Sequence, residues 1–208
     1  MRFQTLTIGF FGTNCYIVWC EGTKEAIVID PGSDATHIIR EIERNQLDVK
    51  YIVNTHGHID HIAANAEVKQ KTGAILLIHK DDAWLLDVKV QESDPFAPML
   101  LKIPSPPPDK LLKEGDIIKF GNEKLGVIHT PGHSPGGICL INKGIIFTGD
   151  TLFAQGIGRT DFPRGSYDQL IRSIKEKLFV LDENLEIYPG HGPKSTILYE
   201  KKHNPFLT

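Results

Sequence analysis

The sequence repeats one order of elements: an apolar strand ending in an acidic residue, a helix, and a second strand ending near a histidine. In the first half this order leads from a strand ending at Asp30 to a strand ending at His56. In the second half it leads from a strand ending at Asp150 to a strand ending just before His191. Each half must bury an apolar sheet face and an apolar helix stripe. Two such halves facing each other predict an α/β fold, a four-layer αββα sandwich of two mixed sheets flanked by helices, with its chemistry at the strand ends where the halves meet.

Hydrophobic periodicity predicts the individual elements. Alternating or continuous apolar runs bounded by turn residues indicate strands, and apolar residues three to four apart indicate helices. The predicted strands span residues 3–8, 15–19, 26–29, 51–53, 74–79, 116–120, 124–129, 137–141, 145–148 and 185–188. The predicted helices begin at Ala35 and span residues 59–71 and 167–181.

Residues 91–109 differ from the rest of the chain because they contain six prolines. Proline has no N–H to donate to a strand ladder, so this stretch is predicted to be an irregular crossing segment. We interpret it as a loop over the surface of one domain, residues 1–208, and not as a linker between two domains. A length of 208 residues fits one domain with a sizeable core.

Composition excludes several classes of protein. The net charge of −3 offers no basic surface for nucleic acid, and no run approaches the ~18 apolar residues of a membrane span. The polar start after Met1 has no apolar segment typical of a signal peptide. Cys15 and Cys20 lie five apart in one strand-like run, so they point to opposite faces and should not pair. We expect these two and Cys139 to be buried, reduced thiols in a cytoplasmic protein.

Five of the nine histidines stand in turn sequences at predicted strand ends, and two aspartates accompany them. Imidazole nitrogens and carboxylate oxygens are ligands for zinc, iron and manganese. His56 and His58 can converge on one ion, since Gly57 permits a sharp turn between them. Asp60 and His61 begin the next helix and are directed away, which suits a second, adjacent ion. Further ligands must come from elsewhere, and the candidates, each preceded by glycine after an apolar strand, are His133, Asp150 and His191.

A capping or turn role would explain one such residue but not the whole set. The four remaining histidines lack a partner motif. We expect His129 to pack against the site or support it, without being a ligand. The others are interpreted as structural or exposed: His37, His79 and His203.

The pattern His56-X-His58-X-Asp60-His61, followed by His133, Asp150 and His191, resembles the signature of the metallo-β-lactamase superfamily. The resemblance covers nearly the whole chain and includes Asp30, which orders the ligand loop in that family. It implies one divalent ion bound by His56, His58 and His133. It implies a second ion bound by Asp60, His61 and His191, with Asp150 bridging both. Asp60 is then the catalytic residue that orients the attacking hydroxide and accepts its proton, and the expected metal is zinc, with iron or manganese as alternatives.

Within that superfamily the segments 129–134 and 148–153 and the tail 204–207 resemble the glyoxalase II branch, the hydroxyacylglutathione hydrolases. The similarity is to its short, single-domain subgroup, without the C-terminal helical domain that holds glutathione. The bridging Asp150 favours hydrolysis of thioesters, phosphodiesters or lactones over hydrolysis of β-lactams. Arg159 falls where this branch binds substrate through a basic residue, although the aromatic expected two residues later is Asp161 here. The resemblance thus implies a small-molecule thioester substrate such as S-D-lactoylglutathione.

Other functions remain in competition. Residues 158–162 resemble the persulfide dioxygenases, which bind one iron through residues corresponding to His56, His133 and Asp150. Lactone or phosphodiester hydrolysis, or a metal-binding domain without catalysis, would use the same ligands. These patterns do not specify the oligomeric state.

Overall fold

The computed structural model describes residues 1–207, whose strands form two six-stranded sheets and one two-stranded sheet. The first sheet has the order β1 (Arg2–Ile8), β2 (Thr13–Trp19), β3 (Glu25–Ile29), β4 (Asp48–Val53), β5 (Ile75–His79) and β6 (Lys110–Leu112). The second has the order β14 (Ser195–Thr196), β13 (Glu186–Pro189), β10 (Ile145–Gly149), β9 (Ile138–Asn142), β8 (Glu123–His129) and β7 (Ile117–Phe120). The small sheet pairs β11 (Leu152–Phe153) with β12 (Gly156–Ile157). Both large sheets are mixed, because β3 to β6 and the pair β10–β13 run parallel while the other neighbours run antiparallel.

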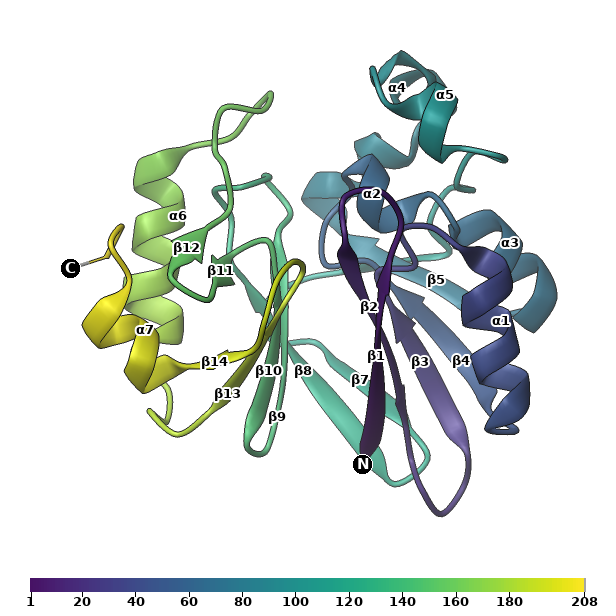
Figure 1. Cartoon of the computed structure of the whole chain (residues 1–208), viewed down its shortest axis with the longest axis horizontal. Helices are drawn as coiled ribbons and strands as arrows, with labels where there is room; N and C mark the ends of the chain where they lie inside the picture. The colour runs from purple at the N-terminus through teal and green to yellow at the C-terminus, as the bar shows by residue number, and fades with distance from the viewer. Residues whose placement is uncertain (208) are drawn as a thin grey trace.

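Helices lie on both outer sides of the paired sheets (Figure 1). Those after strands of the first sheet are α1 (Ala35–Arg44), α2 (Ile59–Ile62), α3 (Asn65–Thr72), the 3₁₀ helix η1 (Lys80–Leu86), α4 (Val88–Ser93) and α5 (Ala97–Leu100). Those on the side of the second sheet are α6 (Tyr167–Ser173), the π-helical turn η2 (Ile174–Leu178) and α7 (Ile197–His203).

Three apolar layers hold this arrangement together. The central layer lies between the sheets and contains residues of both, including Val18, Ile29, Phe120, Leu140 and Phe147. One outer layer packs α1 and α3 against the first sheet, and the other packs α6, η2 and α7 against the second. Burial of each layer is the main stabilising contribution to the fold. The predicted αββα sandwich is therefore confirmed.

The prediction of one continuous helix over residues 59–71 is wrong. The structure has α2 and α3 as separate helices, divided at Ala63 and Ala64. The N–H of Ala64 donates to the carbonyl of Pro31 (2.9 Å), outside the helix. A Cβ on Gly32 would lie 1.6 Å from the carbonyl oxygen of Asp60, so the 31–32 turn packs directly on this backbone. The turn interrupts the helix at the point where it presents Asp60 and His61.

The segment 91–109 is less irregular than predicted, because it includes the end of α4 and the whole of α5. The short strands β6, β11, β12 and β14 and the helices η1 and α7 were not predicted; the strands are too short for a recognisable period. All three cysteines are free and buried, with Cys15 in one outer layer and Cys20 in the central layer, as expected for opposite faces. Within residues 1–207 no helix has the length and apolar character needed to cross a membrane.

Candidate metal centre

The candidate ligands lie where strands of both sheets end. His56 follows β4, and His133 stands in the turn between β8 and β9. Asp150 directly follows β10, and His191 follows β13. The short helix α2 adds Asp60 and His61. The structure therefore brings all seven predicted ligands to one edge of the sandwich.

The first group consists of His56, His58 and His133, whose ligand atoms all lie within 4.8 Å of one another. The Nε2 atoms of His56 and His133 are 3.3 Å apart. Their ring centroids lie 4.8 Å apart, and the ring of His58 is 4.5 Å from that of His133. His56 comes from the first half of the chain and His133 from the second, so this group joins the two sheets.

The second group consists of Asp60, His61 and His191, again within 4.8 Å. The Nε2 atoms of His61 and His191 are 3.2 Å apart. Oδ2 of Asp60 lies 3.3 Å from Nε2 of His191 and 3.6 Å from Nε2 of His61. The two groups match the two ligand sets that the family resemblance implies.

Asp150 lies between the two groups. Its Oδ1 is 3.4 Å from Nε2 of His61, and its Oδ2 is 3.6 Å from Nε2 of both His133 and His191. Oδ1 is buried and accepts no hydrogen bond from residues 1–207. A buried carboxylate oxygen without a donor is costly, so this atom calls for a cation.

The spacing of the donor atoms fits such a cation. Two ligand atoms at about 2.0–2.1 Å from a tetrahedral zinc ion lie about 3.3 Å apart. The Nε2 pairs His56–His133 and His61–His191 have separations of 3.3 and 3.2 Å. The residues present therefore fit two divalent ions.

In three of the histidines the Nδ1 atom contacts another residue, and this contact orients the ring so that Nε2 faces the candidate centre. Nδ1 of His133 donates to the carbonyl of Arg159 (2.6 Å), and Nδ1 of His191 donates to the carbonyl of Phe11 (3.1 Å). Nδ1 of His61 lies 3.0 Å from Oδ2 of Asp30. These contacts select the tautomer that leaves Nε2 free as a ligand.

Asp30 is a buried residue that contacts both Thr55 and His61. Its Oδ1 accepts from the N–H of Thr55 (2.7 Å), and its Oδ2 accepts from the Thr55 hydroxyl (2.6 Å). With His61 on Oδ2 as well, Asp30 connects the residue before His56 to a ligand of the second group. The geometry agrees with the loop-ordering role that the resemblance implies for Asp30.

The charges of the centre favour cation binding. Burial and the neighbouring His61 lower the pKa of His56, and burial with His133 lowers that of His58 to about 3. Both imidazoles are therefore neutral and offer a lone pair at neutral pH. Burial by itself would lower the pKa of His61, but Asp60, Asp150 and Asp30 raise it to about 10. Without a cation this imidazole is therefore protonated, and it would lose that proton when a metal ion takes its place among the three carboxylates. Burial opposes the ionised form of Asp60, yet His61 and His191 lower its pKa, so this carboxylate is ionised.

Arg159 lies beside the first group, but its side chain is already paired. The guanidinium makes two hydrogen bonds to Asp161 (2.8 and 2.7 Å) and lies 4.3 Å from the ring centroid of Phe162. Phe162 in turn packs on His58 at 4.6 Å. The sequence did not single out Phe162 as a wall of the site, because its place beside His58 depends on the course of the 156–166 loop.

The remaining histidines behave differently from the ligands. The rings of His79 and His129 stack at 3.9 Å, and His129 Nε2 donates to the carbonyl of Pro135 (2.9 Å). Packing is thus confirmed for His129, and His79 is buried. Their parallel rings, 16° apart, do not direct in-plane lone pairs at one point, although with Asp81 they form a third cluster of potential ligands.

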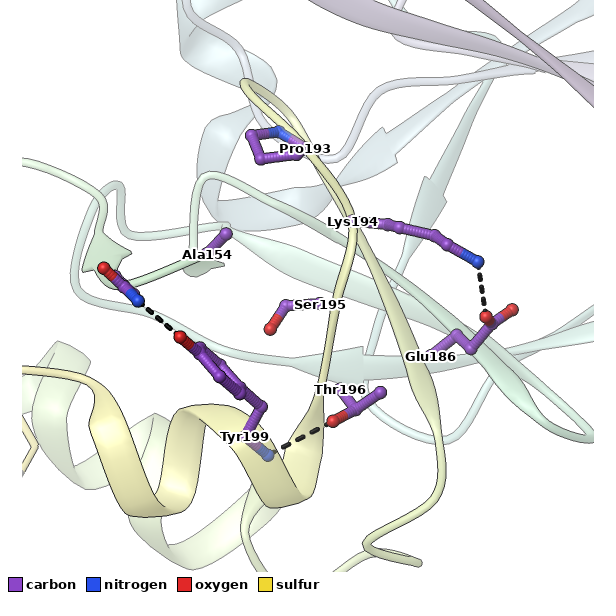
Figure 2. A pocket seen from close by; sticks show the side chains of 8 residues that line it. Ala154, Glu186, Pro193, Lys194, Ser195, Thr196 and Tyr199 are labelled. Atoms are coloured by element: carbon purple, nitrogen blue, oxygen red, sulfur yellow. Dashed lines mark hydrogen bonds and ion pairs between the residues drawn. The ribbon is translucent and has the colours of Figure 1, made fainter.

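A cavity of about 540 Å³ lies beyond the His191 turn, lined by residues of β14, α7 and the β11–β12 hairpin (Figure 2). None of the seven candidate ligands lines it. Its polar side chains pair with each other, as in Lys194–Glu186 (2.6 Å) and Gln155–Tyr199 (2.5 Å). This cavity is separate from the candidate centre.

The chain belongs to the metallo-β-lactamase superfamily, whose family model matches residues 8–191. It is a metallo-hydrolase of that superfamily, whose enzymes bind divalent metals. The chain is 40% identical to hydroxyacylglutathione hydrolase GloC of Haemophilus influenzae, over 100% of this chain and 98% of that protein.

Two solved structures share the fold over the same length. The BLEG-1 B3 metallo-β-lactamase is 36% identical with a TM-score of 0.88, over 100% of both chains. TTHA1623, solved in a di-iron-bound form, is 30% identical with a TM-score of 0.88, over 98% of this chain and 100% of that one.

Proposed function

We propose that this metallo-hydrolase cleaves a small-molecule thioester, with S-2-hydroxyacylglutathione, such as S-D-lactoylglutathione, as the substrate. The observation that carries the proposal is the position of Asp150 between two groups of three ligands, with an unsatisfied buried oxygen. The 40% identity to GloC over the whole chain supports the choice of substrate. Water adds to the thioester carbonyl carbon, the C–S bond breaks, and a hydroxy acid and a free thiol leave.

We propose two divalent ions, one held by His56, His58 and His133 and one by Asp60, His61 and His191, with Asp150 contacting both. Such ions, when bound, supply Lewis acidity that acidifies water and polarises a carbonyl. The donor set of nitrogen and oxygen atoms suits zinc, with iron and manganese as alternatives.

The chain's own residues contribute proton transfer and orientation. Asp60 is ionised and receives a hydrogen bond from the Thr13 hydroxyl on Oδ2 (3.3 Å). That contact fixes the carboxylate beside the centre, where it can orient the attacking water and accept its proton. Arg159 is proposed to bind a carboxylate of the substrate thiol by exchanging it for Asp161. The buried free thiols suit a reducing compartment, and we propose the cytoplasm.

A second candidate function is β-lactam hydrolysis. The 36% identity to a protein described as a B3 metallo-β-lactamase covers both chains completely. The bridging Asp150 favours thioesters by family resemblance, so the two substrates need direct comparison.

The test is a set of assays on one purified, metal-analysed sample. It measures hydrolysis of S-D-lactoylglutathione, oxygen consumption with glutathione persulfide, and hydrolysis of a chromogenic β-lactam. Thioester hydrolysis with two ions per chain supports the proposal. Oxygen uptake with one iron, or a higher kcat/KM for the β-lactam, would overturn it in favour of that activity.

A further inference from the structure

Asp82 is a fully buried carboxylate in η1 that no sequence motif singled out. Its Oδ2 accepts from the N–H of Gly57 (3.2 Å) and from the Ser134 hydroxyl (2.6 Å). Its Oδ1 accepts from the N–H of Gly136 (2.6 Å). One carboxylate thus joins two turns that are remote in sequence, one 25 residues before Asp82 and the other 52 to 54 residues after it.

The two turns are those that carry the first ligand group. Gly57 lies between His56 and His58, and Ser134 directly follows His133. All three hydrogen bonds of the Asp82 carboxylate go to these turns, and none goes to the residues that carry Asp60, His61 or His191. Asp82 therefore contacts one half of the centre selectively.

The glycines of both turns are packed against the same helix. A Cβ on Gly136 would lie 2.5 Å from the backbone N of Asp82. A Cβ on Gly57 would lie 2.5 Å from Cβ of Leu85 and 3.2 Å from the carbonyl oxygen of Asp82. Because only glycine fits at these positions, the approach of η1 to both turns is built into the sequence.

Helix capping does not account for Asp82. The side chain that caps η1 is His79, whose Nδ1 accepts from the N–H of Asp81 (3.3 Å). The Asp82 carboxylate accepts its hydrogen bonds from these three donors, so its burial is costly unless the donors are held in place.

We propose that Asp82 is a positioning residue that sets the relative placement of the His56–His58 turn and the His133 turn. It thereby sets the affinity of the first ligand group for its cation. The inference rests on the two-ion centre proposed above. Some carboxylates orient metal ligands by hydrogen bonds without contacting the metal. Removal of such a carboxylate typically weakens metal affinity by about 10–100-fold.

The main variant is Asp82→Asn, which keeps the volume of the side chain. An amide has one acceptor oxygen and one donor NH₂, whereas the pocket presents donors on both sides. At least one of the two turns therefore faces a donor in place of an acceptor. Ser134→Ala removes a single contact and serves as a milder variant if Asp82→Asn does not fold.

The matched control is Gln91→Met. Gln91 is buried at 2% exposure, and its side chain bonds to the carbonyls of Leu86 (2.9 Å) and Ser105 (3.0 Å). It connects the end of η1 to the 91–109 segment without bonding to either ligand turn. This control should lower the stability of the metal-free protein and leave both metal affinities unchanged.

The experiment is a zinc titration of metal-free protein in competition with a chromogenic chelator, which resolves the two binding steps. His58→Ala and His191→Ala identify the step that belongs to each group. We expect Asp82→Asn to weaken zinc affinity about 10–100-fold at the binding step that His58→Ala removes, and by less than about twofold at the step that His191→Ala removes. Ser134→Ala should weaken the same first step by a smaller factor.

The outcomes separate this inference from the proposed function. If the wild-type protein binds no zinc, the metal centre itself is wrong. If it binds two ions and Asp82→Asn weakens neither step, weakens both equally, or matches Gln91→Met, the positioning role of Asp82 is overturned.

Discussion

At the scale of single residues, Asp150 is the side chain that lies between the two halves of the proposed centre. Its oxygens lie within 3.6 Å of Nε2 atoms in both groups. We predict that Asp150→Ala loses at least one ion and lowers kcat/KM roughly 100-fold or more, because metal ions contribute several kcal/mol to such reactions. Metal analysis and thioester hydrolysis check this, with exposed Asp168→Ala as control. Full metal content and rate in the variant would contradict the bridging role.

Arg159 and Asp161 form an exposed ion pair. Breaking this pair by mutation should affect substrate binding more than protein stability. We predict that Arg159→Ala raises KM about tenfold with kcat little changed, because it loses a charge-assisted contact to the substrate. Asp161→Ala should lower KM, since it frees the guanidinium. Steady-state kinetics on S-D-lactoylglutathione measures both. A fall in kcat at constant KM would assign Arg159 a different role.

His79 makes the stability of the metal-free protein depend on pH. Burial and the stacked His129 lower its pKa to about 4, below the value of about 6.5 in the unfolded chain. Between those values the unfolded state binds the extra proton, so His79 lowers the free energy of unfolding as the pH falls from about 6.5 to about 4. Urea unfolding of wild type and His79→Phe in a chelator checks this. The difference between them should change with pH in that window and stay constant above pH 7.

At the scale of elements, the turn that carries His133 is held by the helix that packs against it. The N–H of Ser166, which caps α6, donates to the carbonyl of Gly132 (2.8 Å), and the Ser173 hydroxyl donates to that of Pro131 (2.7 Å). The sequence predicted the helix and the turn, but not this contact between them. Similarly, it predicted Asp60 and His61 at a helix start, but not the break after α2.

Gly132 tests the contact between α6 and the His133 turn. Its φ is +142°, and a Cβ there would lie 2.3 Å from the backbone N of Leu170. We predict that Gly132→Ala destabilises the metal-free protein by about 2 kcal/mol or more and weakens metal binding, because the turn must move off the helix. Gly73→Ala is the control. It also has positive φ (+70°) but faces open space, so it should cost only about 1 kcal/mol and leave metal binding intact.

At the scale of the whole molecule, each proposed ligand group combines residues that follow strands of both sheets. The run 56–61 follows β4 of the first sheet, whereas His133, Asp150 and His191 follow strands of the second. Bound ions would therefore connect the two halves and stabilise the folded state only. At an ion concentration 100 times the dissociation constant, the gain is about 2.7 kcal/mol.

We predict that chelation lowers the melting temperature by about 5–10 °C, since about 1 kcal/mol corresponds to about 2–4 °C in a domain of this size. Thermal unfolding with chelator, and again after zinc is restored, measures the change. Asp150→Ala should show a smaller difference between the two conditions. An unchanged melting temperature in the wild type would mean that the ions do not join the halves.

The αββα order and the seven candidate ligands could be predicted from the sequence alone. The positions of buried residues follow a regular period along the chain, and the run 56–61 places four candidate ligands, three histidines and one aspartate, within six residues. Tertiary structure decided which side chains support those ligands: Asp30 contacts His61, and Asp82 lies between two ligand turns. It also decided that Asp161 pairs with Arg159. It also decided where the helix after the ligand run breaks, because the 31–32 turn packs on it. The physical reason is that periodicity reflects neighbours in sequence, whereas a contact such as Asp82–Ser134, 52 residues apart, exists only once the sheets and helices have packed.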